Sequence, residues 1–219
     1  MTNKLRENLP PLPERIKSLP IDERGYPVPY FVEWIDGKPE FRIADSRKLI
    51  LCVEKKLCWL CGQRLGTRFT FPVGPMCGIN RISSEPPSHR ECAEFGVRAC
   101  PFLTMPKMIR REAGLPEGAH NPGGLMIRRN PGVTLLWHTR DYKLVEAPPG
   151  FLFRMGEPFE TGWYAEGRPA TRAEIDESVE TGLPFLLQAV DQEPAERRGD
   201  AMKALEAAKA IFTRMLPAA

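Results

Sequence analysis

Apolar and polar residues alternate in the first half of the chain in the way that short β-strands require. Residues 29–45, PYFVEWIDGKPEFRIAD, alternate on both sides of Asp36-Gly37, a dipeptide typical of tight hairpin turns. Residues 67–83, TRFTFPVGPMCGINRIS, have the composition of a strand and are interrupted at Gly74-Pro75. The first segment therefore predicts a hairpin, and the second predicts two short strands joined by a turn.

Helical spacing follows each of these segments. Asp45 or Ser46 can cap a helix through RKLILCVEKK, residues 47–56, in which leucine, isoleucine and valine share one face. A second helix is predicted to begin after two prolines, with Ser88 as its N-cap and Glu91 completing a capping box. The next proline along the chain marks the expected end of that helix.

The C-terminal half is predicted to place strands first and helices after them. Strand patterns recur between residues 132 and 169, whereas residues 106–132 are rich in Pro and Gly and are expected to be irregular. Thr171 and Glu174 form a second capping box, and Gly182 is predicted to stop the helix that they open. Two further helices are expected, one in LPFLLQAV and one in the alanine-rich end of the chain.

Composition indicates an ordinary water-soluble protein. Hydrophobic residues make up 42% and charged residues 27%, and no apolar run approaches the ~20 residues that a membrane-spanning helix needs. The N-terminal residues lack the apolar segment of a secretory signal. We therefore expect a cytoplasmic protein without a membrane partner. Its six cysteines are then better interpreted as thiols or metal ligands than as disulfides.

Four residues have the types and the spacing of a zinc site. Cys58 and Cys61 form a C-x-x-C pair followed by Gly62, whose permissive backbone suits a tight knuckle. His89 and Cys92 lie three positions apart at the predicted start of a helix, so their side chains share one helix face. Three thiolates and one imidazole are the closed, tetrahedral ligand set of structural zinc.

Alternative roles for the cysteines rest on weaker patterns. A redox C-x-x-C pair belongs in a thioredoxin-like βαβ unit, and none is evident. Cys100 lies eight positions after Cys92, about 12 Å along an intact helix, whereas sulfurs on one zinc lie within ~4 Å of each other. An iron–sulfur cluster that recruits Cys77 and Cys100 stays an alternative, as does Cys77 in place of His89 as the fourth ligand. Cys52 is expected to be a buried structural thiol.

The order of a cysteine knuckle, a hairpin and two ligands in the first turn of a helix resembles the treble-clef zinc finger, over roughly residues 55–100. The remainder of the chain resembles uncharacterised proteins of bacteria and their phages, which implies no activity. Treble clefs occur in ribosomal, nuclease, ubiquitin-ligase and structural proteins. The resemblance therefore implies metal binding and leaves the function open.

An enzymatic alternative follows from the same resemblance, because HNH nucleases build their active site on a treble clef. That family implies histidines on or beside the hairpin, and residues 64–87 contain none. His120 and His138 lie elsewhere, and a structural role is expected for a strand histidine such as His138. Cys77 is the candidate nucleophile of a cysteine-dependent enzyme, with Arg81 placed to lower its pKa.

Charge is distributed unevenly, although the net charge is only +3. Residues 47–154 hold 17 Lys and Arg against 8 Asp and Glu, and residues 155–219 hold 7 against 12. A basic region of this kind is compatible with nucleic acid, and equally with a solvated face or one docked on the acidic tail. Three arginines around the predicted finger are the candidates for phosphate contact: Arg64, Arg68 and Arg81.

Together these patterns predict an α+β protein with short mixed strands and helices around a treble-clef zinc site, followed by a strand-then-helix C-terminal half. We expect residues 1–25 to form an extended arm. Residues 26–105 are expected to hold the hairpin, the first helix and the zinc site, and residues 106–219 to pack on them in one continuous body. The expected function is a zinc-stabilised, non-catalytic binding or adaptor protein, with nucleic acid as the first partner to test and a protein partner as the second. An atypical HNH-related or cysteine-dependent enzyme is the alternative.

Overall fold

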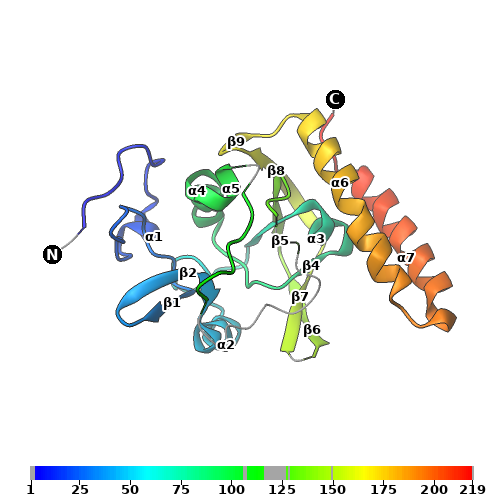
Figure 1. The fold of residues 1–219 in the computed structure, drawn as a ribbon, viewed down its shortest axis with the longest axis horizontal. Helices are drawn as coiled ribbons and strands as arrows, with labels where there is room; N and C mark the ends of the chain where they lie inside the picture. Colours follow the sequence, from blue (N-terminus) through cyan, green and yellow to red (C-terminus); the bar gives the residue numbers. More distant parts are fainter. Residues whose placement is uncertain (1–2, 106–107, 116–126, 128, 149, 219) are drawn as a thin grey trace.

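The computed structural model describes residues 3–105, 108–115, 127, 129–148 and 150–218. Short helices and antiparallel strands alternate along this part of the chain, and two long helices follow the last strand. Figure 1 shows the N-terminal segment, which includes α1 (Glu14–Lys17), at one end of the molecule and the two long helices at the other. The predicted α+β class, with strands before helices in the C-terminal half, is confirmed.

The strands of the described residues form three antiparallel sheets, ordered β1-β2, β3-β5-β8-β9 and β4-β7-β6. Their bounds are β1 (Val32–Ile35), β2 (Lys38–Ala44), β3 (Phe69–Val73), β4 (Ile82–Ser83), β5 (Thr134–Thr139), β6 (Tyr142–Ala147), β7 (Gly150–Met155), β8 (Pro158–Ala165) and β9 (Arg168–Pro169). The central strand β5 is buried along its whole length. The four-stranded sheet therefore forms the middle of the fold.

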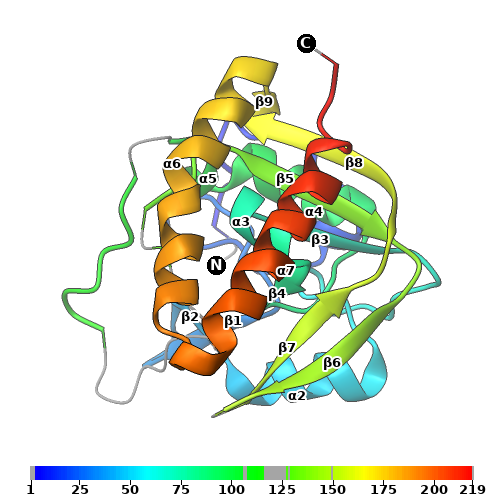
Figure 2. The same cartoon turned by 90° about the vertical axis from the view of Figure 1, so that its right-hand side faces the viewer.

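Helices cover this sheet and its edges. Their bounds are α1 (Glu14–Lys17), α2 (Ser46–Lys55), α3 (Pro75–Asn80), α4 (Arg90–Ala99), α5 (Pro101–Thr104), α6 (Arg172–Asp191) and α7 (Ala195–Thr213). Figure 2 shows α6 and α7 side by side and antiparallel, as the outer layer of one end of the molecule. Short helix α3 contacts both of them and also β5, so it joins this outer layer to the sheet.

Several turns and caps have the predicted chemistry. The β1–β2 hairpin turns at Asp36 and Gly37, both with positive φ. The side chain of Asp45 accepts hydrogen bonds from the backbone N–H groups of Arg47 and Lys48, which caps α2. Thr171 begins α6 with the predicted capping box. These local signals involve residues close in sequence, so the amino-acid pattern alone could reveal them.

The segment after β3 differs from the prediction of two strands joined by a turn. Gly74 and Pro75 begin helix α3, and strand β3 pairs with β5 whereas β4 pairs with β7. Proline suits the first position of a helix because its missing N–H is not needed there. Met76 and Ile79 are buried, so apolar residues that resemble a strand pattern instead form the inner face of a short helix.

Gly182 does not stop a helix, contrary to the prediction. Helix α6 continues through Gly182 and Pro184 to Asp191. A Cβ atom at Gly182 would lie 2.8–2.9 Å from three side-chain atoms of Met76, so this glycine permits close packing of α6 on α3. Pro184 lacks an N–H for the helix ladder, and nearby the Arg129 guanidinium donates a hydrogen bond of 3.0 Å to the carbonyl oxygen of Thr181.

One apolar core runs through the sheets and helices. It extends from Ile16 in α1 to Phe212 in α7 and includes three buried cysteines of the predicted metal site. Aromatic rings fill its centre: the ring of Tyr142 lies edge-on to Phe69 and Phe71, with centroid distances of 5.1 and 5.8 Å. The three cysteines predicted as metal ligands thus lie within the apolar core. None of the helices in the described ranges combines the length and apolarity needed to cross a membrane.

Candidate metal centre

The first pair of ligands lies on a tight knuckle closed by backbone hydrogen bonds. The N–H of Cys58 donates to the carbonyl of Gln63 (2.8 Å), and the N–H of Gly62 donates to the carbonyl of Cys58 (2.8 Å). Gly62 has φ of 73°, and a Cβ atom there would lie 2.6 Å from the ring of Tyr30. Glycine is therefore required both by the left-handed backbone and by the aromatic ring packed on it.

The second pair of ligands lies at the start of α4. His89 is the N-cap residue of this helix, and Cys92 lies in its first turn. Two backbone hydrogen bonds between Ser88 and Thr70, of 2.8 and 3.0 Å, attach the approach to α4 to the edge of β3. The sheet therefore holds the helix start against the knuckle.

The predicted cap of α4 is wrong by one residue. Ser88 is the residue before the N-cap, and no side chain caps the helix. The hydroxyl of Ser88 is buried and has no hydrogen-bond partner in the described structure. Both backbone groups of Ser88 are used in an isolated β-bridge to Thr70, which holds this residue beside β3, one position before the helix boundary.

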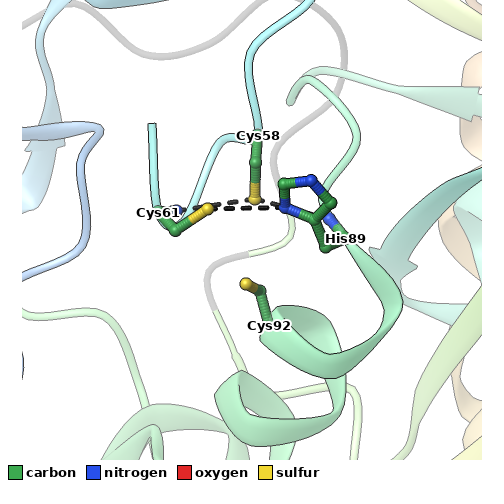
Figure 3. Close-up of side chains that lie close together, drawn as sticks. All are labelled: Cys58, Cys61, His89 and Cys92. Carbon is green, nitrogen blue, oxygen red and sulfur yellow. Dashed lines mark hydrogen bonds between the residues drawn. The ribbon is translucent and has the colours of Figure 1, made fainter. Parts of the chain in front are cut away.

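The four predicted metal ligands converge on one point (Figure 3). Their ligand atoms all lie within 4.8 Å of one another, and every one of these residues is buried: Cys58, Cys61, His89 and Cys92. This is the scale of a single metal ion, whose sulfur ligands in a tetrahedral zinc site lie about 3.8 Å apart. The cluster could therefore hold one metal ion.

The imidazole of His89 is oriented as a metal ligand. Its Nδ1 atom lies 3.4 Å from Sγ of Cys61, and its Nε2 atom lies 3.1 Å from the carbonyl oxygen of Arg64. A carbonyl can only accept, so Nε2 carries the proton and donates it. Nδ1 then faces the thiols and is the ring atom that a metal ion would bind. Histidines that bind metals usually donate their second ring N–H to a carbonyl or carboxylate in this way.

The backbone also favours negative charge on sulfur. The N–H groups of Cys61 and His89 donate to Sγ of Cys58, at 3.5 and 3.4 Å. Burial opposes ionisation of Cys58, but hydrogen bonds from its three neighbouring ligands hold its pKa far below the ordinary value. Hydrogen bonds with the thiols of Cys58 and Cys61 raise the pKa of His89 to about 10. A buried thiolate among such neighbours is an electron-rich group that a bound cation stabilises.

The other cysteines lie outside the cluster. Cys52 is buried in α2, and burial together with the nearby Cys58 and Cys61 thiols raises its pKa to about 12. Cys100 is at the C-terminal end of α4. The cluster contains His89 rather than Cys77 as its fourth member. Among the described residues no second group of metal-ligating side chains of this kind is found.

Cys77 is exposed as a residue, but its thiol lacks the lowered pKa of an activated nucleophile. Its pKa is raised to about 11, by desolvation and by the nearby carboxylate of Glu85. A raised pKa leaves little thiolate at neutral pH. Arg81, predicted to lower this pKa, instead forms two contacts with the carboxylate of Glu157, at 2.5 and 3.0 Å.

The three arginines predicted to contact phosphate have different surroundings. Arg64 is exposed directly after the knuckle and gives its backbone carbonyl to His89. Arg68 is exposed in the segment before β3. Arg81 ends α3, where its guanidinium binds Glu157 and lies 5.8 Å from the ring of Trp137. Only Arg64 and Arg68 leave their charged groups without a carboxylate partner among the described residues.

Of the two other histidines, His138 is not part of the group of converging side chains. His138 is buried on β5, and its Nδ1 atom lies 2.8 Å from Oγ1 of Thr70 on β3. Burial and the nearby Arg90 lower its pKa. His120 lies outside the described residues.

Comparison with known proteins adds no assignment to this geometry: no protein-family model, no curated protein and no solved structure matches the chain. The site is therefore interpreted from its own residues.

Proposed function

We propose that the protein is a zinc-stabilised, non-catalytic binding or adaptor protein. The observation that carries this proposal is the convergence of three buried thiols and one imidazole from two separate segments. Zinc would be held by Cys58, Cys61, His89 and Cys92 and would supply a cross-link between the knuckle and α4. Four protein ligands complete a tetrahedral site and leave no open position for a reacting water.

The ligand types support zinc over other metals. Thiolate and imidazole ligands in a tetrahedral set favour zinc, whereas oxygen-rich sets favour magnesium or calcium. A reducing, cytoplasmic setting suits this use of cysteine, and all six cysteines are free thiols. The knuckle followed by ligands at a helix start supports a treble-clef type of finger. The expected hairpin between the two ligand pairs is absent from the described structure. In its place are β3 in the four-stranded sheet, helix α3, and β4 in the three-stranded sheet.

Nucleic acid is the proposed partner. This part of the proposal is supported by the excess of Lys and Arg in residues 47–154 and by the exposed, unpaired side chains of Arg64 and Arg68. Arg81 is the weakest of the three candidates because Glu157 already neutralises its charge. Binding through phosphate contacts releases counterions, so affinity should fall steeply as salt concentration rises.

Removing the metal tests whether it is structural. Elemental analysis of purified protein is expected to give about one zinc per chain. A strong chelator should then lower the melting temperature and reduce the circular dichroism signal, because metal binding and local folding are linked. The proposal is overturned if the stripped protein keeps its melting temperature and circular dichroism while losing a hydrolytic activity, since such a site would be catalytic.

A further inference from the structure

Strand β8 carries a bulge where it pairs with β5. Pairing passes from His138 and Glu160 directly to Thr139 and Pro158, so Phe159 is an extra residue of β8 without a partner. Bulges redirect side chains and are common beside binding sites. The side chain of Phe159 is 43% exposed, so the bulge presents this aromatic ring at the surface.

Two arginines accompany the ring. The guanidinium carbons of Arg68 and Arg140 each lie 5.7 Å from the ring centroid of Phe159, within the range of a cation–π contact. Arg68 precedes β3 and Arg140 follows β5, so three segments far apart in the sequence meet here. Arg68, Arg140 and Phe159 are termed the arginine–aromatic cluster.

Neither arginine of the cluster has its charge satisfied within the described chain. Both are exposed, and neither forms an ion pair or a hydrogen bond through its guanidinium with a described residue. The neighbouring Arg90 is the opposite case, because Glu160 binds it at 2.7 and 2.5 Å and Glu94 binds it at 2.8 Å. The fold therefore neutralises one arginine of this surface and leaves two available.

Neither acidic group near the cluster, Glu160 or Asp141, forms an ion pair with Arg68 or Arg140 in the described structure. The pKa of Glu160 is lowered by its hydrogen bonds with Arg90, and Arg68 contributes at longer range. The carboxylate of Asp141, next to Arg140 in sequence, accepts a hydrogen bond of 3.4 Å from the hydroxyl of Thr139. The two guanidinium groups of the cluster thus have Phe159 as a cation–π partner but no carboxylate partner among the described residues.

We propose that the arginine–aromatic cluster is a binding platform for single-stranded nucleic acid. This inference rests on the nucleic-acid partner proposed above and names the form of nucleic acid and the residues that bind it. Phe159 supplies a π-face on which an unpaired base stacks once the guanidinium groups of Arg68 and Arg140, which lie over the ring in the structure, turn to the adjacent phosphates. A base within a duplex is already stacked and offers no free face, so the exposed ring favours single strands.

The experiment uses the zinc-loaded full-length chain and fluorescence anisotropy with a labelled oligothymidylate, an oligouridylate and a DNA duplex, each at several salt concentrations. Wild type is expected to bind the single strands at least 10-fold more tightly than the duplex. Phe159→Ala should weaken single-strand binding about 10-fold or more. The plot of log K against log salt has a negative slope. Arg68→Ala and Arg140→Ala should each make that slope less steep, by about 0.7.

Matched control variants test whether binding depends on the cluster itself or on any exposed arginine or aromatic residue. Trp34 is exposed to nearly the same extent as Phe159, at 42%, but lies on the distant β1–β2 hairpin. Trp34→Ala should therefore leave binding unchanged. Arg214→Ala, at the end of α7, removes an exposed arginine from another surface and should leave the salt slope unchanged.

Three results overturn the platform, and they differ in what they leave standing. If wild type binds single strands but Phe159→Ala and Arg140→Ala bind equally well, the cluster is not the site, and the nucleic-acid partner stands with other residues. Equal binding of duplex and single strands by wild type would show that the cluster does not select single strands, and the nucleic-acid partner again stands. If folded, zinc-loaded wild type binds no nucleic acid at low salt, the proposed partner itself is wrong and a protein partner takes its place.

Discussion

The Nδ1 atom of His89 lies 3.4 Å from the Sγ atom of Cys61, although 28 residues separate them in the chain. The opposite ring nitrogen is held by the carbonyl of Arg64, 3.1 Å away. The backbone carbonyl thus fixes the ring through Nε2, and the opposite nitrogen, Nδ1, faces sulfur. This arrangement distinguishes a ligand from a histidine that is merely packed near cysteines, and it leads to the first prediction.

Replacing one ligand should abolish tight metal binding, whereas replacing another cysteine should not. Cys58→Ser and Cys92→Ser each remove a thiolate from the centre of the cluster, and we expect both to lose zinc in elemental analysis and to melt at a lower temperature. Cys52→Ser and Cys100→Ser are the matched controls and should keep one zinc per chain. A visible charge-transfer band in the wild type would instead indicate an iron–sulfur cluster.

The fourth ligand is tested by a second pair of variants. His89→Ala should lower zinc affinity strongly, and Cys77→Ser should not, because Cys77 lies outside the group of converging side chains. Zinc affinity is measured by competition with a chromogenic chelator. The opposite pattern, with zinc lost only in Cys77→Ser, would show that the ligand set is assigned incorrectly.

The buried hydroxyl of Ser88 gives a prediction about stability. If Ser88 were the N-cap of α4, Ser88→Ala would cost about 1 kcal/mol. In the structure its Oγ atom has no partner, and burying an unsatisfied hydroxyl is unfavourable. Ser88→Ala should therefore leave the free energy of unfolding unchanged or raise it by up to about 1 kcal/mol. Urea denaturation of the zinc-loaded protein measures this difference.

Asp45 is the matched control for that measurement. Its carboxylate caps α2 through hydrogen bonds from two backbone N–H groups, so Asp45→Ala should lower the free energy of unfolding by about 1 kcal/mol. A loss of that size in Ser88→Ala as well would contradict the observed start of α4. Equal m-values for the variants and the wild type are required for the comparison.

The four residues of the candidate metal cluster were predictable from the sequence because they form two local pairs. Spacing alone places Cys58 beside Cys61 and His89 beside Cys92, and the ligand types indicate that the two pairs meet. The same reasoning excluded Cys100 by distance along a helix. Caps and hairpin turns, such as Asp45 and the Asp36-Gly37 pair, were predictable for the same reason, since their chemistry acts within a few residues.

Features that depend on tertiary contacts were not predictable in this way. The segment from Gly74 to Asn80 forms a helix because α6, α7 and β5 surround its apolar side, and no local signal reports those neighbours. Arg81 finds its carboxylate 76 residues away in Glu157. The bulge at Phe159 depends on how β5 and β8 pair. The sequence alone does not indicate which of these distant residues are in contact in the fold.

His138 predicts how stability changes with pH. Burial and the positive charge of Arg90 lower its pKa, with the carboxylates of Glu160 and Glu94 acting in the opposite direction; the hydroxyl of Thr70 is its hydrogen-bond partner. The unfolded chain therefore takes up the proton at a higher pH than the folded one. The stabilisation is complete above the unfolded pKa of ~6.5 and is lost as pH falls below it, until the folded pKa is passed.

We expect wild type to lose stability between pH 7 and pH 5, and His138→Gln to lose less over the same range. Glutamine retains a hydrogen-bonding group for Thr70 but does not titrate. Urea denaturation at several pH values, with zinc in excess, measures both slopes. Parallel slopes for the two proteins would show that the imidazole ionises equally well in the folded and unfolded states.

The last prediction concerns the contact of α3 with the sheet and the C-terminal helix. A Cβ atom at Gly78 would lie 2.7 Å from Cδ2 of Leu135 on β5 and 2.7 Å from Cε2 of Phe212 on α7. Both neighbours are buried, at 0% and 2% exposure, so neither can move without disturbing the core. Gly78→Ala should therefore lower the free energy of unfolding by about 1–3 kcal/mol, the usual cost of overpacking.

Gly199 is the matched control, because it lies within helix α7 and an added Cβ atom there meets nothing within 4 Å. Alanine is a better helix former than glycine, so Gly199→Ala should raise the free energy of unfolding by up to about 1 kcal/mol. Opposite signs for the same substitution at two helical glycines separate packing from helix propensity. If both substitutions stabilise the protein, α3 is not wedged between β5 and α7 as the structure places it.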